Sequence, residues 1–256
     1  MKVTIITVAY NSAATIVEAL ASVAQQTHPD IEHIVVDGGS TDDSLALIAA
    51  HGQRIARLVS EPDNGIYDAM NKGLRLATGE LIGFLNSDDT FASDDTIAQV
   101  ARAASVGQPD AVFGDLVYVD PARSRPLVRY WRAGNFSLAK LRLGWMPPHP
   151  TLYTRRDVIE RVGCFDATLK IAADYEFMLR LLVRPGLKVT YIPKVLVKMR
   201  LGGASNQSIK AMLRKSSEDL RAMRKHRVGG VVALLFKNLR KLPQFWAQPH
   251  HEITAR

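Results

Sequence analysis

The most constraining feature of this sequence is a regular alternation of strand-like and helix-like segments over its first 85 residues. Apolar, β-branched runs predict strands at 3–9, 31–37, 54–61 and 80–85. Segments of helical periodicity separate them, at 13–26, 42–51 and 66–77. This β-α-β-α-β-α-β order predicts an α/β fold in which a mostly parallel sheet is flanked by helices. In such a sheet, functional residues gather at the carboxyl ends of the strands.

The pattern changes after residue 90. We predict helices at 94–105, 137–143 and 173–183, strands at 111–120 and 187–192, and a short strand that becomes a helix over 151–163. Residues 121–135 indicate an irregular or hairpin segment, and GWMPPHP at 144–150 indicates a rigid loop.

The net charge of +8 is confined to the C-terminal end of the chain. Residues 206–256 contain 11 Lys or Arg and 3 Asp or Glu, so residues 1–205 sum to zero. We therefore predict a domain over 1–205 followed by a basic, amphipathic helical tail over 206–256. A neutral body with a basic tail is not typical of nucleic-acid binding, and we expect no nucleic-acid partner.

Cysteine usage and hydropathy predict a cytoplasmic protein. The chain has one cysteine, Cys164, so it cannot form an intrachain disulfide, as is typical of a reducing compartment. It has no apolar run of 18 residues, and its first residues lead straight into a predicted strand instead of a signal peptide.

Carboxylates mark the expected functional edge of the sheet. The stretch GELIGFLNSDD at 79–89 ends an apolar strand in Asn86, Ser87, Asp88 and Asp89. Adjacent carboxylates repel each other, and a hard divalent cation such as Mg²⁺ or Mn²⁺ removes that conflict. A site of this kind would neutralise a diphosphate, but an acidic turn that caps the next helix has the same residues.

Four segments, in this order, resemble glycosyltransferase family 2. They are VTIITVAYN at 3–11, VVDGGSTDDS at 35–44, PDNGIYDAMNKGLRLATGELIGFLNSDD at 62–89 and IAADYEFMLRL at 171–181. The likeness covers roughly residues 1–203 and is similar to the bacterial branch that builds capsule, exopolysaccharide or O-antigen chains. It implies the GT-A fold, a nucleotide-diphosphate sugar as donor, and inversion of the anomeric centre.

The resemblance also implies roles for individual residues. Asp174, which opens the helix at 173–183, would be the catalytic base, and Asp88 would bind the metal. Asn86 stands where many relatives carry an Asp, which removes one negative charge from the metal site. Nucleotide contacts are expected from Thr7, Val8, Ala9, Tyr10, Asp37, Asp68, Asn71, Lys72, Asn86 and Ser87. Contacts with acceptor or phosphate are expected from Asp89, Trp145, His149 and Arg200.

Two of these expectations have a stated chemical reason. A carboxylate at Asp37 suits the N–H of uracil, which favours a UDP-sugar. Asp68, Asn71 and Lys72 lie at helical spacing, so they share one face that could meet ribose and phosphates.

The tail divides into two amphipathic stretches. Residues 208–225 carry an apolar stripe that we expect to pack against the body. VGGVVALLFKNLRKLPQFW at 228–246 joins apolar and aromatic residues to Lys237, Arg240 and Lys241. Such a stretch suits an interfacial helix on an anionic membrane, where a polyprenyl-diphosphate-linked acceptor would lie. A surface for a partner protein or for a homodimer is the alternative.

The sequence thus predicts a metal-dependent inverting hexosyltransferase that acts on a glycan or lipid-linked acceptor, peripheral at the inner face of the plasma membrane. A non-catalytic nucleotide-sugar-binding scaffold stays open because of Asn86. A nucleotidyltransferase is a second alternative, although VAYNSAATI at 8–16 lacks the glycines and basic residues of that class. No G-x-G-x-x-G follows the first strand, which disfavours a Rossmann dehydrogenase.

Overall fold

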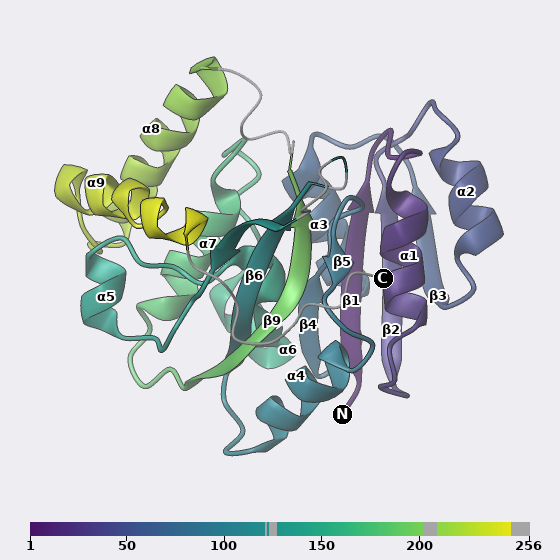
Figure 1. Cartoon of the computed structure of the whole chain (residues 1–256), viewed down its shortest axis with the longest axis horizontal. Helices are drawn as coiled ribbons and strands as arrows, with labels where there is room; N and C mark the ends of the chain where they lie inside the picture. The colour runs from purple at the N-terminus through teal and green to yellow at the C-terminus, as the bar shows by residue number, and fades with distance from the viewer. Residues whose placement is uncertain (121, 123–126, 202–208, 247–256) are drawn as a thin grey trace.

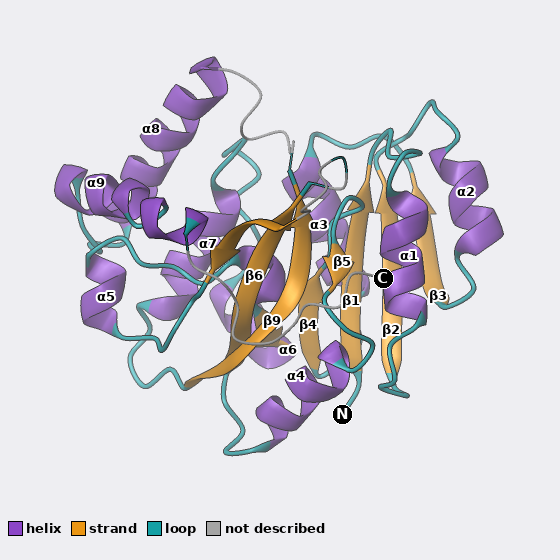
Figure 2. Cartoon of the chain, in the orientation of Figure 1, coloured by secondary structure: helices purple, strands orange, loops and turns teal. Residues whose placement is uncertain are grey.

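The computed structural model describes residues 1–120, 122, 127–201 and 209–246 of the 256-residue chain. Helices cover both faces of one mixed sheet, and the predicted α/β fold class is confirmed (Figure 2). The first half contains β1 (Val3–Ala9), α1 (Ile16–Ala24), β2 (Ile31–Asp37), α2 (Ser44–His51), β3 (Ile55–Ser60), α3 (Ile66–Leu76) and β4 (Leu81–Phe84).

These first strands form a parallel sheet whose carboxyl ends align. β1 pairs with β2 from Val3 opposite Ile31 to Ala9 opposite Asp37, and β4 lies on the other side of β1. The alternation of side chains along β2 explains the helices on both faces, because Val35 packs with α1 and α2 while its neighbours in sequence pack with α3. The loop after β4 therefore leaves the sheet at the edge where β1 and β2 end.

The second half adds short and antiparallel strands to the sheet. It contains β5 (Thr90–Phe91), α4 (Thr96–Ser105), β6 (Ala111–Val119), β7 (Leu127–Trp131), α5 (Leu138–Arg142), the 3₁₀ turn η1 (His149–Thr151), β8 (Tyr153–Arg155), α6 (Arg156–Val162), α7 (Ala173–Leu182) and β9 (Val189–Arg200). The strand order is β3-β2-β1-β4-β8-β6-β9-β5, with β7 paired to β6. Among the described strands the pairings are half parallel and half antiparallel, so the sheet is more mixed than its sequence pattern predicts.

Strand β9 is the largest departure from the predicted elements. The sequence predicts a strand at 187–192, but β9 continues through Pro193 to Arg200. It does so because it pairs with β6 along its length, with register shifts around Asp115 that accommodate the proline and its neighbour. This extension brings Arg200 to the same edge as the loop after β4.

The tail forms α8 (Ile209–Lys225), α9 (Val231–Leu239) and the 3₁₀ turn η3 (Leu242–Phe245). With α5 these helices occupy one end of the molecule, and α1 and α2 occupy the other (Figure 1). Of the predicted apolar stripe of α8, Met223 is buried in the same apolar core as α7, but Met212 and Leu213 are exposed, so the stripe packs against the body only near its C-terminal end. Within the described parts of the chain, no helix is both long and apolar enough to span a bilayer.

Candidate active site

The loop after β4 and the end of β9 lie far apart in sequence but meet at the carboxyl edge of the sheet, where the Arg200 backbone N–H donates to Asp89. The positive charge of Arg200 also acts on Asp88. Burial raises the pKa of the Tyr118 hydroxyl, the charge of Arg129 opposes that rise, and the charges of Asp89 and Asp174 add to it. Tyr118 thus lies within electrostatic reach of both the predicted base and the predicted metal-binding turn.

The two adjacent carboxylates of the β4 loop differ in environment. Asp89 is fully buried and accepts hydrogen bonds from Asn86 Nδ2 (3.0 Å) and the Arg200 backbone N–H (3.3 Å). Burial and the charge of Asp88 raise the pKa of Asp89 to about 8. Asp88 is only half-buried; burial raises its pKa, and Arg200 opposes that rise. Asp89 therefore braces the turn, and Asp88 is the carboxylate available to a ligand.

Asn86 contributes a second oxygen to this turn. Its Nδ2 donates to Asp89, while its Oδ1 is buried and has no hydrogen-bond partner among the described residues. No cluster of three His, Cys, Asp or Glu side chains in the described chain could hold a metal ion by itself. The residues present fit Mg²⁺ or Mn²⁺ held by Asp88, with Asn86 Oδ1 beside it and the phosphates of a donor as the remaining oxygen ligands.

Asp174 lies in the first turn of α7, half-buried. Its Oδ1 accepts a hydrogen bond from the Tyr175 backbone N–H (2.8 Å) and lies 3.1 Å from the Tyr67 hydroxyl, which also lies 2.7 Å from the Ile171 carbonyl oxygen. One carboxylate oxygen is thereby oriented by α3 and α7. The Asp174 side chain is thereby held at the start of α7.

A residue that the sequence analysis did not identify supports this helix start. Glu218 of α8 accepts hydrogen bonds from the backbone N–H groups of residues 170–172, at 2.9 to 3.2 Å. The N-cap residue Ala172 makes no side-chain capping bond, so Glu218 satisfies N–H groups that would otherwise be orphaned. No local pattern around position 218 signals this role.

His149 and Trp145 of the predicted aromatic loop lie in different surroundings. His149 is buried, stacks on Phe84 at 5.5 Å and meets Phe165 edge-on; burial lowers its pKa, while the Asp174 charge acts in the opposite direction. His149 thus lies within electrostatic reach of the predicted base. Trp145 is also buried, and its Nε1 donates to the Ala133 carbonyl oxygen (2.7 Å). Trp145 serves the core and does not present a free face to a sugar at this edge.

The predicted nucleoside contacts of β1 are constrained by burial. Thr7 is buried with its Oγ1 3.0 Å from His33 Nε2, and Val8 and Ala9 are also buried. Only Tyr10 exposes its side chain, at 63%. Any contact from the first three positions would therefore come from backbone atoms.

Asp37 is fully buried and already satisfied at the end of β2. One oxygen accepts from the backbone N–H groups of Gly39 (3.1 Å) and Ser40 (3.0 Å) and from the Ser60 hydroxyl (2.8 Å). The other accepts from the Ser40 hydroxyl. The carboxylate shapes the turn after β2, and it has no free oxygen aimed at a base as predicted.

The predicted polar face of α3 forms hydrogen bonds and an ion pair with neighbouring loops. Both groups of the Asn71 amide bond the backbone of Phe165, each at 2.9 Å, in a buried position. The Asp68 carboxylate accepts from the Asn64 N–H (3.1 Å), and Lys72 pairs with Glu61 (2.9 Å). The structure thus gives Asn71 an internal role in place of the predicted ribose or phosphate contact.

Two further polar groups complete the neighbourhood. Ser87 Oγ lies 2.8 Å from Ser12 Oγ and ties the β4 loop to the start of α1.

Asp115, in the apolar run of β6, is buried. It accepts hydrogen bonds from the Tyr191 hydroxyl (2.8 Å), the Tyr130 hydroxyl and the Ala133 N–H (2.8 Å). The sequence analysis passed over Asp115, although a carboxylate inside an apolar strand is a visible signal.

Comparison with known proteins identifies the family. The family model described as Glycosyl transferase family 2 matches residues 4–176. The chain belongs to glycosyltransferase family 2. A PGL/p-HBAD biosynthesis glycosyltransferase of Mycobacterium bovis (strain BCG / Pasteur 1173P2) is 34% identical over 201 residues, which are 77% of this chain and 76% of that protein.

Solved structures show the same GT-A fold. Staphylococcus aureus TarS 1–349 in complex with UDP-GlcNAc superposes with a TM-score of 0.72 at 21% identity, over 89% of this chain and 66% of that one. Mannosyltransferase PcManGT from Pyrobaculum calidifontis, in complex with GDP-Man and Mn²⁺, has a TM-score of 0.67 at 21% identity, over 96% of this chain and 73% of that one. The chain spans just under two thirds of the length of the TarS fragment. The family match includes Asp88 and Asp174 and ends before Arg200 and Glu218.

Proposed function

We propose that this glycosyltransferase is a metal-dependent, inverting hexosyltransferase. It moves a sugar from a nucleotide-diphosphate sugar, a UDP-sugar in our proposal, to a hydroxyl of a glycan or lipid-linked acceptor in cell-surface polysaccharide biosynthesis. The reaction takes place in the cytoplasm, at the inner face of the plasma membrane.

The observation that carries this proposal is the pairing of Asp174 with the Asp88 turn at one edge of the sheet. Asp174 is held at the start of α7 through one oxygen, which leaves the other to accept a proton from an acceptor hydroxyl. The hydroxyl then attacks the anomeric carbon from the face opposite the leaving diphosphate, and the configuration inverts.

In this proposal the diphosphate leaves beside Asp88 and the side-chain oxygen Asn86 Oδ1. A bound divalent cation would offset the negative charge that develops on the leaving group. Asp89 holds this turn in place, since its buried carboxylate accepts from Asn86 Nδ2 and from the backbone of Arg200. The UDP-GlcNAc complex of TarS and the Mn²⁺ and GDP-Man of PcManGT are consistent with such a donor site and leave uridine as our choice between the two bases.

Thermal melting with UDP, GDP, dTDP and CMP, each with and without Mn²⁺, tests the donor site. A ligand at about 100 times its dissociation constant adds about 2.7 kcal/mol to the free energy of unfolding. We expect a UDP-selective, Mn²⁺-dependent shift that Asp88→Ala abolishes. The control Asp157→Ala removes an exposed carboxylate of α6 whose one ion pair among the described residues is with Arg161, at 2.8 Å, and it should keep the shift.

The outcome also separates the alternatives. A protein that melts identically with every nucleotide has no donor site, and our proposal is then wrong. A nucleotide shift without any transfer to acceptor, in the wild-type chain, would instead favour the non-catalytic nucleotide-sugar-binding scaffold.

A further inference from the structure

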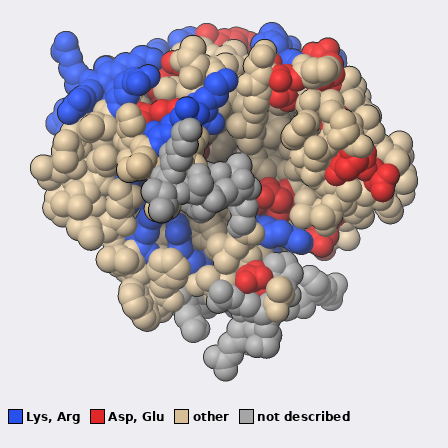
Figure 3. Space-filling model, turned by 90° about the horizontal axis from the view of Figure 1, so that it is seen from above, with Lys and Arg blue, Asp and Glu red and all other residues tan. Residues whose placement is uncertain are grey.

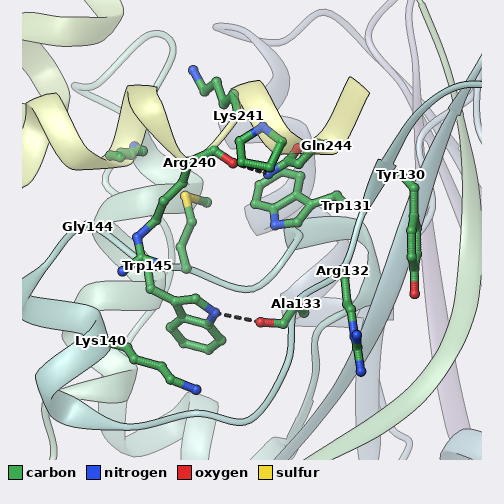
Figure 4. A pocket seen from close by; sticks show the side chains of 13 residues that line it. Tyr130, Trp131, Arg132, Ala133, Lys140, Gly144, Trp145, Arg240, Lys241 and Gln244 are labelled. Carbon is green, nitrogen blue, oxygen red and sulfur yellow. Dashed lines mark hydrogen bonds between the residues drawn. The ribbon is translucent and has the colours of Figure 1, made fainter. Parts of the chain in front are cut away.

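A cavity of about 320 Å³ lies between β7, the loop after α5, and the α9–η3 segment, away from the donor turn (Figure 4). Its wall contains five basic residues and no acidic one among the described residues. They are Arg132, Lys140, Lys237, Arg240 and Lys241. The rest of the wall is mostly apolar and includes the aromatic residues Tyr130, Trp131 and Trp145, so the cavity combines positive charge with apolar surface.

Most of this charge is not neutralised within the described chain. Lys237 is buried and paired with Asp219 at 2.7 Å. Lys140, Arg240 and Lys241 instead donate to the neutral oxygens of Asn135, Leu143 and Asn238, and in the described residues none of the three has an ion pair. A cavity with unpaired cations is stabilised when an anion enters it.

Neighbouring cations add to this field. Burial and the charges of Lys215 and Arg129 lower the pKa of Lys241. The Arg129 guanidinium lies 4.1 Å from the centre of the Tyr118 ring and 5.7 Å from that of Phe245, and its buried Nε has no partner in the described structure. Lys and Arg side chains gather over the α8–α9 end of the molecule (Figure 3).

The cavity wall also lies within electrostatic range of the proposed base, Asp174. The charge of Asp174 acts on Lys237 in the cavity wall, and it acts on Tyr118 beneath Arg129. Lys237 lies over the ring of Tyr175, the residue after the base, at 3.3 Å from the ring centre.

Helix α9 and turn η3, beside the cavity, have a burial pattern opposite to that of an ordinary surface helix, which buries its apolar face and exposes its charged residues. α9 buries Lys237 and exposes its large apolar residues except Leu234, which packs against the core. The exposed apolar side chains of α9, η3 and the residue that follows are Val231, Val232, Leu235, Phe236, Leu239, Leu242, Phe245 and Trp246. A contiguous apolar surface flanked by unpaired cations matches an anionic bilayer, whose interior takes the apolar side chains and whose headgroups meet the cations.

We propose that α9 and η3 lie in the interface of an anionic membrane and that the adjoining basic cavity binds the phosphate-bearing headgroup of a lipid-linked acceptor. The acceptor role of this lipid rests on the proposed transferase function. The docking itself does not, because it depends only on the apolar face and the cations.

Vesicle co-sedimentation of the full chain tests the docking. The chain should bind phosphatidylcholine vesicles that contain about 30% phosphatidylglycerol and should not bind pure phosphatidylcholine. Arg240→Gln/Lys241→Gln should weaken binding by roughly tenfold or more, and Leu235→Ser/Trp246→Ser should do the same.

Matched control variants carry the same substitutions elsewhere on the surface. Arg57→Gln/Arg75→Gln and Leu58→Ser/Val106→Ser alter exposed residues outside the tail and should bind as the wild type does. Equal binding by wild type and tail variants would overturn the inference. Light scattering gives a second test. If the wild type is a dimer and Leu235→Ser/Trp246→Ser is a monomer, the inference is also overturned, because the apolar face would then bind a second copy of the chain.

A third variant tests the cavity. Lys140 lies in the wall but outside α9 and η3, so Lys140→Gln should weaken binding to vesicles carrying a polyprenyl diphosphate severalfold more than binding to phosphatidylglycerol vesicles of equal charge. If Lys140→Gln loses binding to both kinds of vesicle equally, Lys140 contributes only general electrostatic attraction, and the headgroup site is overturned.

Melting with UDP and Mn²⁺ on the same preparations separates the two proposals. A wild-type chain that shows the nucleotide shift but does not bind phosphatidylglycerol vesicles overturns docking alone. A wild-type chain that binds these vesicles without any nucleotide shift overturns the transferase and leaves docking in place.

Discussion

Glu218 lies beyond the family match, yet its carboxylate holds the backbone that leads into Asp174. Its two oxygens accept three N–H groups, from residues 170–172, and the side chain is buried. In Glu218→Gln the shape is kept, but the charge is lost and one oxygen becomes an NH₂ group. That group cannot accept a hydrogen bond, so at least one N–H loses its partner.

The size of the effect follows from these contacts. Hydrogen bonds to charged groups contribute about 1.5–3 kcal/mol and neutral ones about 0.5–1.5 kcal/mol. Three charge-assisted bonds contribute at least about 4.5 kcal/mol and two neutral ones at most about 3 kcal/mol, so the free energy of unfolding should fall by at least about 1.5 kcal/mol. For a chain of this size that corresponds to a melting temperature lower by at least about 3–6 °C.

Urea denaturation measures this change directly. Glu160→Gln is the matched control, because Glu160 is exposed and, in the part of the chain that the structure describes, forms an ion pair with Arg156 alone, at 3.3 Å, one helical turn away. Such a pair contributes less than about 0.5 kcal/mol. If Glu218→Gln and Glu160→Gln unfold at the same urea concentration with the same slope, the capping argument is refuted. A transfer assay should show a lower turnover in Glu218→Gln with UDP binding kept, since the donor turn lies on other elements.

Three further predictions concern the site and the sheet. Asp174→Asn should lower transfer about 10²- to 10⁴-fold and leave the UDP-dependent melting shift unchanged; a retained rate would remove Asp174 as the base. Burial and the charge of Arg54 lower the pKa of His33 from 6.5 to about 4. Below pH 6.5 the unfolded chain therefore binds a proton that the folded chain does not bind. The free energy of unfolding should fall by about 3 kcal/mol between pH 6.5 and pH 4. Chemical denaturation at several pH values should show that loss in the wild type and not in His33→Gln. Gly83→Ala would place a Cβ 2.2 Å from the Tyr153 ring in the core and should destabilise the protein by about 3 kcal/mol in urea titration, and an unchanged midpoint would contradict this packing.

Much of the fold was readable from local pattern. The boundaries of β2 match the predicted strand at 31–37, and α7 begins at the predicted residue 173. Periodicity and caps report what a segment does on its own, which is why these elements were predictable. β9 was not, because Pro193 interrupts the pattern and only pairing with β6 extends the strand to Arg200.

The sequence likewise predicted some features of the candidate site and not others. The sequence placed Asp88 after a strand and Asp174 at the start of a helix, as the structure has them, and their roles stay predictions. It could not show that Asp37 is bonded by neighbouring backbone and serine hydroxyls, or that Asn71 is bonded by the backbone of Phe165, since a motif reports a residue type and not its partners.

By itself, then, the sequence determined the α/β order, the family and the carboxylates at the sheet edge, all properties of short stretches. Tertiary structure decided which polar groups remain free for a ligand. It also decided that Glu218 holds the start of α7, and that α9 buries Lys237 while it exposes its apolar residues. The physical reason is that burial and hydrogen-bond satisfaction depend on which distant segments pack together, and no local pattern contains that information.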